Sequence, residues 1–272
     1  MQPGQWGGHA IEMTADRVIK RFPAVERGRA VCEWRALTLL HAHAPGLAPR
    51  PWEADLEAAE PTVVMSRLAG VPLRGAALDR ERTDALARAV TRIHTAVPSD
   101  IVREVPVREG HLGALIVRVR RWGVTVRPQA TGVVRQAMDA GLAWLARSGA
   151  DVRTTGEVPA VFGAGDGNLA NYLWDGVRVQ VVDFEESGRS DRAFELAEII
   201  EHVGSWVEHP LDVSAFLGHF DLTPAETVRL RECRRLLALV WLFLLTRDAA
   251  TRPRNPAGTA ERQAERLLDR LL

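Results

Sequence analysis

The chain has 272 residues, which is long enough for one large domain or for two lobes with a sizeable core. Basic and acidic residues are equal in number at 35 each, so the sequence predicts no basic surface for nucleic acid and no polybasic membrane anchor. Cys32 and Cys233 lack metal-ligand spacing, no signal-peptide pattern is present, and the longest apolar run, Leu236 to Leu245, is too short to span a bilayer. We therefore expect a cytoplasmic protein, monomeric or homodimeric, that binds neither nucleic acid nor membrane.

The N-terminus is rich in glycine and is followed by a predicted β-hairpin. Three glycines within residues 4–8 could form a loop that covers phosphate groups, or they could belong to a frayed terminus. Residues 9–14 and 17–22 have strand-like patterns on either side of a short turn, which predicts a hairpin. The chain leaves no room for a further strand ahead of the glycines, so we expect an abbreviated first sheet.

Lys20, on the second strand of this hairpin, is the only lysine in the chain. Every other basic residue is arginine, and the two are not interchangeable where a compact ammonium on a slim stem must reach a phosphate. The strand pattern around Lys20 matches the strand lysine of kinase-type sites. The alternative is that a lone lysine arose by chance in an arginine-rich chain.

A helix is predicted from Glu26 to Ala44, because Val31, Trp34 and Leu37 recur at helical spacing. Glu33 lies among these apolar positions, where an unpaired carboxylate would be costly to bury. Lys20 is the natural partner, since a strand lysine paired with a helix glutamate is typical of active kinases. A solvated Glu33 is the alternative.

Residues 62–68 form the next predicted strand, and the chain then turns through Gly70 and Pro72. If the protein has two lobes, this is the hinge between them, near residue 70. Adenine would then bond to the backbone from Ser66 to Leu68.

The remainder is predicted to be mainly helical. Apolar stripes at helical spacing, an acidic cap at Asp191 and a nearly all-apolar run mark the predicted helices, which include Leu86 to Val97, Leu112 to Trp122, Val133 to Leu145, one that begins after Asp191, Leu236 to Leu245, and Ala260 to Leu272.

The segment from Val161 to Ser187 carries the strongest chemical pattern. An Asp-Gly pair between two apolar runs predicts a hairpin with a type I′ turn, in which both central residues have positive φ. Asp166, Asn171 and Asp183 would meet at its open end. Two carboxylates and an amide oxygen suit Mg²⁺, and their order and spacing match kinase-type phosphoryl transfer. An ordinary hairpin with polar ends is the alternative.

Taken together, these segments resemble the aminoglycoside phosphotransferase and choline kinase group, which shares the two-lobed protein-kinase-like fold. The family patterns H-G-D-x-x-x-x-N, I-D-[WF]-E and G-x-x-D-x-x-x-[DE]-L-A are similar to Ala164-Gly165-Asp166 with Asn171, to Val182-Asp183-Phe184-Glu185 and to the run from Gly188 to Ala197. Arg92-Ile93-His94 is similar to the family's L-H helix ending, and the resemblance covers about residues 20–203.

The resemblance implies an α+β fold with a small, abbreviated, β-rich N-terminal lobe (1–70) and a larger, mainly helical C-terminal lobe (71–272) that contains the catalytic hairpin (161–187). It implies transfer of the γ-phosphate of ATP to a hydroxyl of a small molecule, with ATP and Mg²⁺ as cofactors. By this resemblance Asp166 would be catalytic, Asn171 and Asp183 would bind Mg²⁺, and Lys20 with Glu33 would position ATP.

The acceptor favoured by the resemblance is an aminoglycoside-like antibiotic or a related amino sugar or amino alcohol. Acidic residues that could hold a polycation, or that could equally be solvated surface or loop braces, are Glu185, Glu186, Asp191, Glu195, Glu198, Glu201, Glu208 and Asp212. Trp206 and Trp241 could contribute to an aromatic site for a choline-like ammonium, or they could be core residues.

A non-catalytic nucleotide-binding or regulatory protein on a kinase-like scaffold remains the alternative. The short N-terminus and Ala164, where the family has a histidine, favour it. The complete set of five chemical residues, from Lys20 to Asp183, argues for an enzyme.

Overall fold

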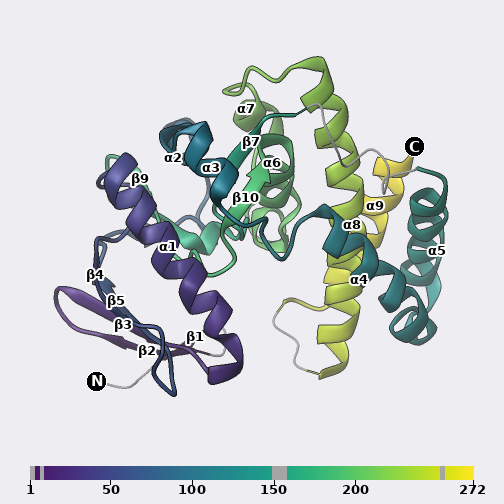
Figure 1. Ribbon diagram of the computed structural model, residues 1–272. Helices are drawn as coiled ribbons and strands as arrows, with labels where there is room; N and C mark the ends of the chain where they lie inside the picture. The colour runs from purple at the N-terminus through teal and green to yellow at the C-terminus, as the bar shows by residue number, and fades with distance from the viewer. Residues whose placement is uncertain (1–3, 7–8, 149–157, 252–254) are drawn as a thin grey trace.

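The computed structural model describes residues 4–6, 9–148, 158–251 and 255–272. Its N-terminal part is an antiparallel sheet with one long helix beside it, and the rest is mainly helical (Figure 1). This sheet has five strands in the order β1-β2-β3-β5-β4, namely β1 (Gly4–Trp6), β2 (His9–Met13), β3 (Arg17–Arg21), β4 (Pro51–Asp55) and β5 (Thr62–Ser66). The arrangement confirms the predicted α+β class with a small β-rich part and a larger helical part.

Strands β2 and β3 form the predicted hairpin, in which Ile11 lies opposite Lys20. Thr14 closes the turn, because its amide donates to the Arg17 carbonyl and its hydroxyl donates to Asp16. On β3 the side chain of Lys20 is buried, while Arg17 on the same strand is exposed. The hairpin therefore carries the lone lysine into the interior of the protein.

A short strand lies within the glycine-rich stretch, where the sequence suggested a phosphate-covering loop or a frayed terminus. Residues Gly4–Trp6 form β1 and pair with the start of β2, with Trp6 opposite His9. No strand ahead of Gly4 is among the described residues. Gly7 and Gly8, the other two glycines of the possible phosphate loop, lie outside the described residues.

Helix α1 (Arg27–His43) occupies almost the whole predicted range and lies beside the sheet (Figure 1). Its fully buried positions include Ala30, Glu33, Leu37 and Leu40, which recur every three or four residues and so share one face. Glu33 thus lies within the apolar stripe and is 1% exposed. A carboxylate in this position needs a cation.

The C-terminal part contains the helices that the apolar stripes predicted, along with two short helices that they did not. These helices are α2 (Arg80–Ala96), α3 (Ser99–Glu104), α4 (Leu112–Thr125), α5 (Gly132–Arg147), α6 (Arg192–Glu201), α7 (Val213–Leu217), α8 (Pro224–Thr251) and α9 (Thr259–Leu271). Helix α8 contains the run Leu236 to Leu245, most of which is buried against the other helices, as its all-round apolar sequence predicts. Asp79 and Asp191 cap α2 and α6 by accepting backbone N–H groups.

Two small sheets hold the predicted catalytic segment. One has the order β6-β8-β9 and the other pairs β7 with β10, the strands being β6 (Val71–Pro72), β7 (Ala160–Gly163), β8 (Tyr172–Trp174), β9 (Val179–Val181) and β10 (Gly188–Asp191). The β8–β9 hairpin is confirmed, but its type I′ turn was wrong. Only Gly176 has positive φ, because the Asp175 carboxylate accepts the amides of Val177 and Arg178 and closes a four-residue loop.

The chain changes sheets between Ser66, the end of β5, and Val71, the start of β6. We propose that the two lobes meet here, near residue 70. Searching the described part of the chain for a helix both long and apolar enough to cross a membrane gave none.

Candidate active site

The loop from β7 to β8 is built on glycines that allow very close packing. Gly165 has φ +102°, and a Cβ on it would lie 2.3 Å from the backbone carbonyl of Glu186. A Cβ on Gly167 would lie 2.3 Å from the carbonyl carbon of Glu198. Because no side chain fits at either position, the loop backbone rests directly on the segments after β9 and on α6. The residue between these glycines, Asp166, is therefore held on a rigid support.

Asp166 is fixed by two hydrogen bonds. Its Oδ1 accepts the Asn168 amide at 3.0 Å, and its Oδ2 accepts the Asn171 side-chain amide at 3.2 Å. Although about a third of the side chain is exposed, partial burial, together with the charges of Glu186 and Asp183, raises the pKa of Asp166 to about 7. The structure thus brings together Asp166 and Asn171, and it places Asp183 within electrostatic range of them.

Asp183 has φ +67°, and among the described residues it is the only non-glycine residue with positive φ. Aspartate tolerates this left-handed conformation better than most residues, but it still costs energy and is typical of functional sites. The side chain is 41% exposed, and its Oδ1 lies 2.5 Å from Lys20 Nζ. The end of β9 therefore turns Asp183 towards the N-terminal sheet.

Lys20 makes the predicted ion pair with Glu33, at 3.2 Å. Its ammonium also lies 2.5 Å from Glu185 Oε2, in addition to Asp183. Burial disfavours the charged lysine, but the three carboxylates outweigh it and hold the pKa of Lys20 above its usual value. Burial raises the pKa of Glu33 to about 7, with Lys20 acting in the opposite direction.

The sequence did not predict that residues 185 and 186 would connect the two parts of the molecule. Glu185 lies 2.9 Å from His9 Nε2 and 2.9 Å from Arg29, and Arg29 also reaches Glu186 at 3.1 Å. Lys20 adds ion pairs to Asp183 and Glu185. The segment 183–186 is therefore paired with residues of β2, β3 and α1. The sequence offered no signal for this, since arginine and glutamate are abundant and their partners lie far apart in the chain.

The donor set fits a hard divalent cation. Asn171 uses its amide nitrogen on Asp166, which leaves its amide oxygen for a ligand role, and Asp183 offers a half-exposed carboxylate. Glu33, Asp183 and Glu185 also offer oxygen atoms within 4.8 Å of one another. Lys20 bonds to all three, however, so its ammonium already occupies the space between these oxygens and offsets part of their negative charge.

The predicted hinge residues lie at the end of β5. Ser66 exchanges hydrogen bonds with the Arg50 backbone, and Arg67 donates its amide to the Asp16 carbonyl. Leu68 is half-buried and follows the strand. A base bound here would bond to the Leu68 amide or to carbonyl oxygens, because the preceding amides are already donated.

Arg108, between α3 and α4, braces the loop that carries Asp166. It is 4% exposed, lies 2.8 Å from Glu195 Oε1 and 3.5 Å from Glu198 Oε1, and donates to the Gly165 carbonyl. Burial raises the pKa of Glu198 to about 8, whereas at Glu195 the combined effect of Arg108, Ser190 and His94 outweighs burial and lowers the pKa. The sequence could not single out Arg108 among so many arginines.

Several acidic residues considered for a polycation are internal braces. Asp191 binds Arg229 at 2.9 Å, and Glu201, which is 0% exposed, binds Arg234 at 2.7 Å. Glu208 and Asp212 are exposed. The tryptophans considered for an aromatic site belong to the core, since Trp206 is 7% exposed and packs in a cluster that includes Trp241.

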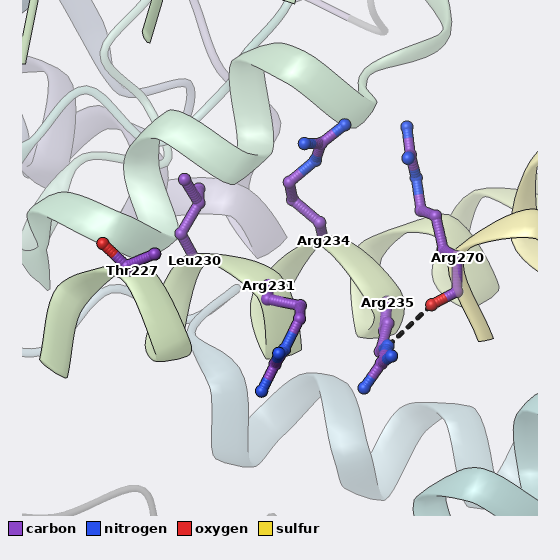
Figure 2. A pocket seen from close by; sticks show the side chains of 6 residues that line it. All are labelled: Thr227, Leu230, Arg231, Arg234, Arg235 and Arg270. Carbon is purple, nitrogen blue, oxygen red and sulfur yellow. Dashed lines mark hydrogen bonds between the residues drawn. The ribbon is translucent and has the colours of Figure 1, made fainter. Parts of the chain in front are cut away.

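A separate cavity of about 310 Å³ lies on the C-terminal helices α8 and α9, lined by Thr227, Leu230, Arg231, Arg234, Arg235 and Arg270 (Figure 2). Figure 2 shows that these arginines diverge: Arg234 and Arg270 point to one side, and Arg231 and Arg235 point to the other. The first pair binds the buried Glu201. This cavity contains none of the residues around Asp166.

The sequence model of one family, described as the phosphotransferase enzyme family, matches residues 9–237. The chain belongs to this family. The match runs from β2 into α8, so it includes the strand of Lys20, the loop of Asp166 and the residue Asp183. The expectation of an enzyme of the phosphotransferase class is confirmed. Comparison with curated protein sequences gave no match.

Solved structures share the fold of this phosphotransferase. They include aminoglycoside phosphotransferase APH(3'')-Id from Streptomyces rimosus (20% identity, TM-score 0.59, 87% of this chain and 89% of that chain) and choline kinase LicA from Streptococcus pneumoniae (16%, 0.63, 99% and 91%). Spectinomycin phosphotransferase APH(9)-Ia, in complex with ADP and spectinomycin, is similar as well (13%, 0.65, 99% and 87%). The predicted kinase-like architecture is therefore confirmed.

Proposed function

We propose that this phosphotransferase moves the γ-phosphate of ATP to a hydroxyl group of a small molecule, with Mg²⁺ as the metal. The observation that carries the proposal is the arrangement of four side chains. Asp166 bonds to Asn171 and lies within electrostatic range of Asp183, and Asp183 binds Lys20. An acceptor base, two metal ligands and a phosphate-binding cation are what direct phosphoryl transfer needs.

Asp166 would orient the acceptor. Its carboxylate would accept a hydrogen bond from the acceptor hydroxyl and take the proton late in the reaction. A pKa of about 7 suits both steps, because the group can be ionised before transfer and protonated after it. The Asn168 and Asn171 bonds keep the carboxylate in one orientation.

Lys20 would bind the phosphates of the nucleotide. For this it must exchange Glu185 for phosphate oxygens while it keeps its bond to Glu33. Arg29 and His9 would retain Glu185 during this exchange, because both already contact its carboxylate. Mg²⁺, held by Asn171 and Asp183, would neutralise charge on the phosphates when bound.

The acceptor we propose is an aminoglycoside-like antibiotic or a related amino sugar or amino alcohol. Support comes from the similar solved structures, which include a choline kinase and a complex with spectinomycin. Near the proposed base, Glu186 is 42% exposed and its charge acts on Asp166, which suits a cationic acceptor. The segment from Ser66 to Leu68 would bind adenine through its backbone.

The test is acceptor-dependent ADP release from Mg·ATP, measured with a panel of aminoglycosides and amino alcohols. We expect Asp166→Ala to lower turnover by at least about 10³-fold while the unfolding midpoint changes little. Undiminished turnover in this variant would contradict the assignment of the base. A thermal shift with Mg·ATP but no release with any acceptor would favour the non-catalytic nucleotide-binding alternative.

A further inference from the structure

His202 follows α6 and lies near Oδ1 of Asp166, whereas Asn171 bonds to Oδ2. It is 5% exposed, and its Nε2 lies 3.7 Å from Asp166 Oδ1. Its other ring nitrogen, Nδ1, accepts the backbone N–H of Gly204 at 2.9 Å. The residue is thus placed between a fixed backbone donor and the proposed base.

The Gly204 bond determines which nitrogen of His202 carries the proton. A nitrogen that accepts a hydrogen bond has no proton, so a neutral imidazole in this position must be protonated on Nε2. Burial, together with the positive charge of Arg74, lowers the pKa of His202 to about 3, so the ring stays neutral at ordinary pH. The nitrogen that faces Asp166 is therefore an N–H donor.

The ring cannot easily turn away. Trp241 packs edge-on against it, with centroids 4.5 Å apart and an interplanar angle of 80°. The turn at Gly204 is also tight, since a Cβ there would lie 3.1 Å from His202 Nδ1 and 3.2 Å from Asn168 Oδ1. This turn therefore contacts both the histidine and the loop that holds Asp166.

We propose that His202 is a positioning residue for the phosphoryl transfer, whose neutral Nε2–H holds Oδ1 of Asp166 and leaves Oδ2 for the acceptor hydroxyl. The proposal rests on the proposed role of Asp166 as the base. Oδ1 already accepts the Asn168 amide, so a second donor from His202 uses its remaining lone pair. Among the residues that the structure describes, Oδ2 has one bonded partner, Asn171.

The separation of 3.7 Å is longer than a hydrogen bond. Catalytic hydrogen bonds are often long without substrate and shorten in the substrate complex. A shift of less than about 1 Å between the two side chains, with the loop backbone held in place, would bring the pair within bonding distance. A misplacement of this size at a reacting group costs about 10²-fold in rate.

The test compares His202→Phe, which keeps a ring but removes the donor, with His202→Gln, which can keep an N–H near the Nε2 position. We expect His202→Phe to lower kcat by about 10- to 100-fold with the KM for ATP nearly unchanged, and His202→Gln to restore most of the loss. His94→Phe is the matched control, because His94 is also buried in this lobe, but the charges that act on it are those of Glu195, Arg192 and Asp191. Wild-type kcat in His202→Phe, or equal losses in Phe and Gln, would overturn the proposal.

A second measurement does not depend on finding the acceptor. Long-range ¹H–¹⁵N spectra of the imidazole should report a neutral His202 protonated on Nε2, and its Nε2–H signal should move in Asp166→Ala. A charged ring, protonation on Nδ1, or an unchanged signal in Asp166→Ala would overturn the proposal. Because this readout requires no turnover, it separates failure of the His202 proposal from failure of the proposed function.

Discussion

Lys20 is the only lysine of a chain with 35 basic residues, and its ammonium lies between 2.5 and 3.2 Å from three carboxylates. The composition alone singles out Lys20, because a single lysine among arginines can be recognised without knowing the structure. Composition could not supply Glu185 as its third partner. The proposed role in binding phosphate calls for a small cation here, since the ammonium would have to keep its bond to Glu33 while it exchanges a carboxylate for phosphate.

Replacing Lys20 with arginine tests whether its size matters as well as its charge. The guanidinium is larger and planar, and it prefers bidentate bonds to one carboxylate over point contacts with several groups. We expect Lys20→Arg to lower kcat/KM for ATP by roughly 10²-fold, with a folded protein by circular dichroism. Arg21→Lys, on the same strand and paired with exposed Glu12, is the control and should leave kinetics unchanged. Wild-type kinetics in Lys20→Arg would mean that only the charge is used.

At the scale of elements, the hydrophobic periodicity predicted the helices and hairpins well, because those patterns are local. The same patterns could not predict contacts between distant segments. Arg108 and Glu195 are 87 residues apart, yet their ion pair supports the catalytic loop. The sequence analysis predicted no strand at Pro51–Asp55, but β4 forms there because β5 offers it an antiparallel partner.

The Arg108–Glu195 pair should matter more for stability than exposed ion pairs do. Both side chains are at most 6% exposed, so removing the cation leaves a buried, unpaired carboxylate. We expect Arg108→Met to lower the free energy of unfolding by about 3–5 kcal/mol in a urea titration. Adding Glu195→Gln should recover part of this loss. If the double variant is no more stable than Arg108→Met, the bond to the Gly165 carbonyl, not the ion pair, is the main contribution.

At the scale of the whole molecule, the two parts are joined by the chain near residue 70 and by ion pairs from the segment 183–186. His9, Lys20 and Arg29 come from three different N-terminal elements and all reach this segment. Asp183, which we propose as a metal ligand, is thus also a point of contact between the parts. The sequence pattern singled out Asp183 but could not predict this second role, which depends on how the sheet and α1 lie relative to the helical part.

Buried histidines should bind protons when the chain unfolds at acidic pH. Burial lowers the pKa of His94 to about 4, against about 6.5 in an unfolded chain. Between these values the unfolded state binds a proton that the folded state does not, so His94 destabilises the fold progressively as the pH falls from about 6.5 to 4. Above about pH 6.5 both states are neutral and the effect disappears. The full effect is about 3 kcal/mol.

The wild-type curve alone cannot isolate this effect, because the raised pKa values of Glu33 and Glu198 act in the opposite direction over part of the same range. The difference between wild type and His94→Gln removes those shared contributions. We expect the variant to gain stability relative to wild type as the pH falls through this window, measured by urea unfolding at several pH values. Parallel curves would mean that His94 becomes protonated in the folded protein, with the carboxylate of Glu195 stabilising its charge.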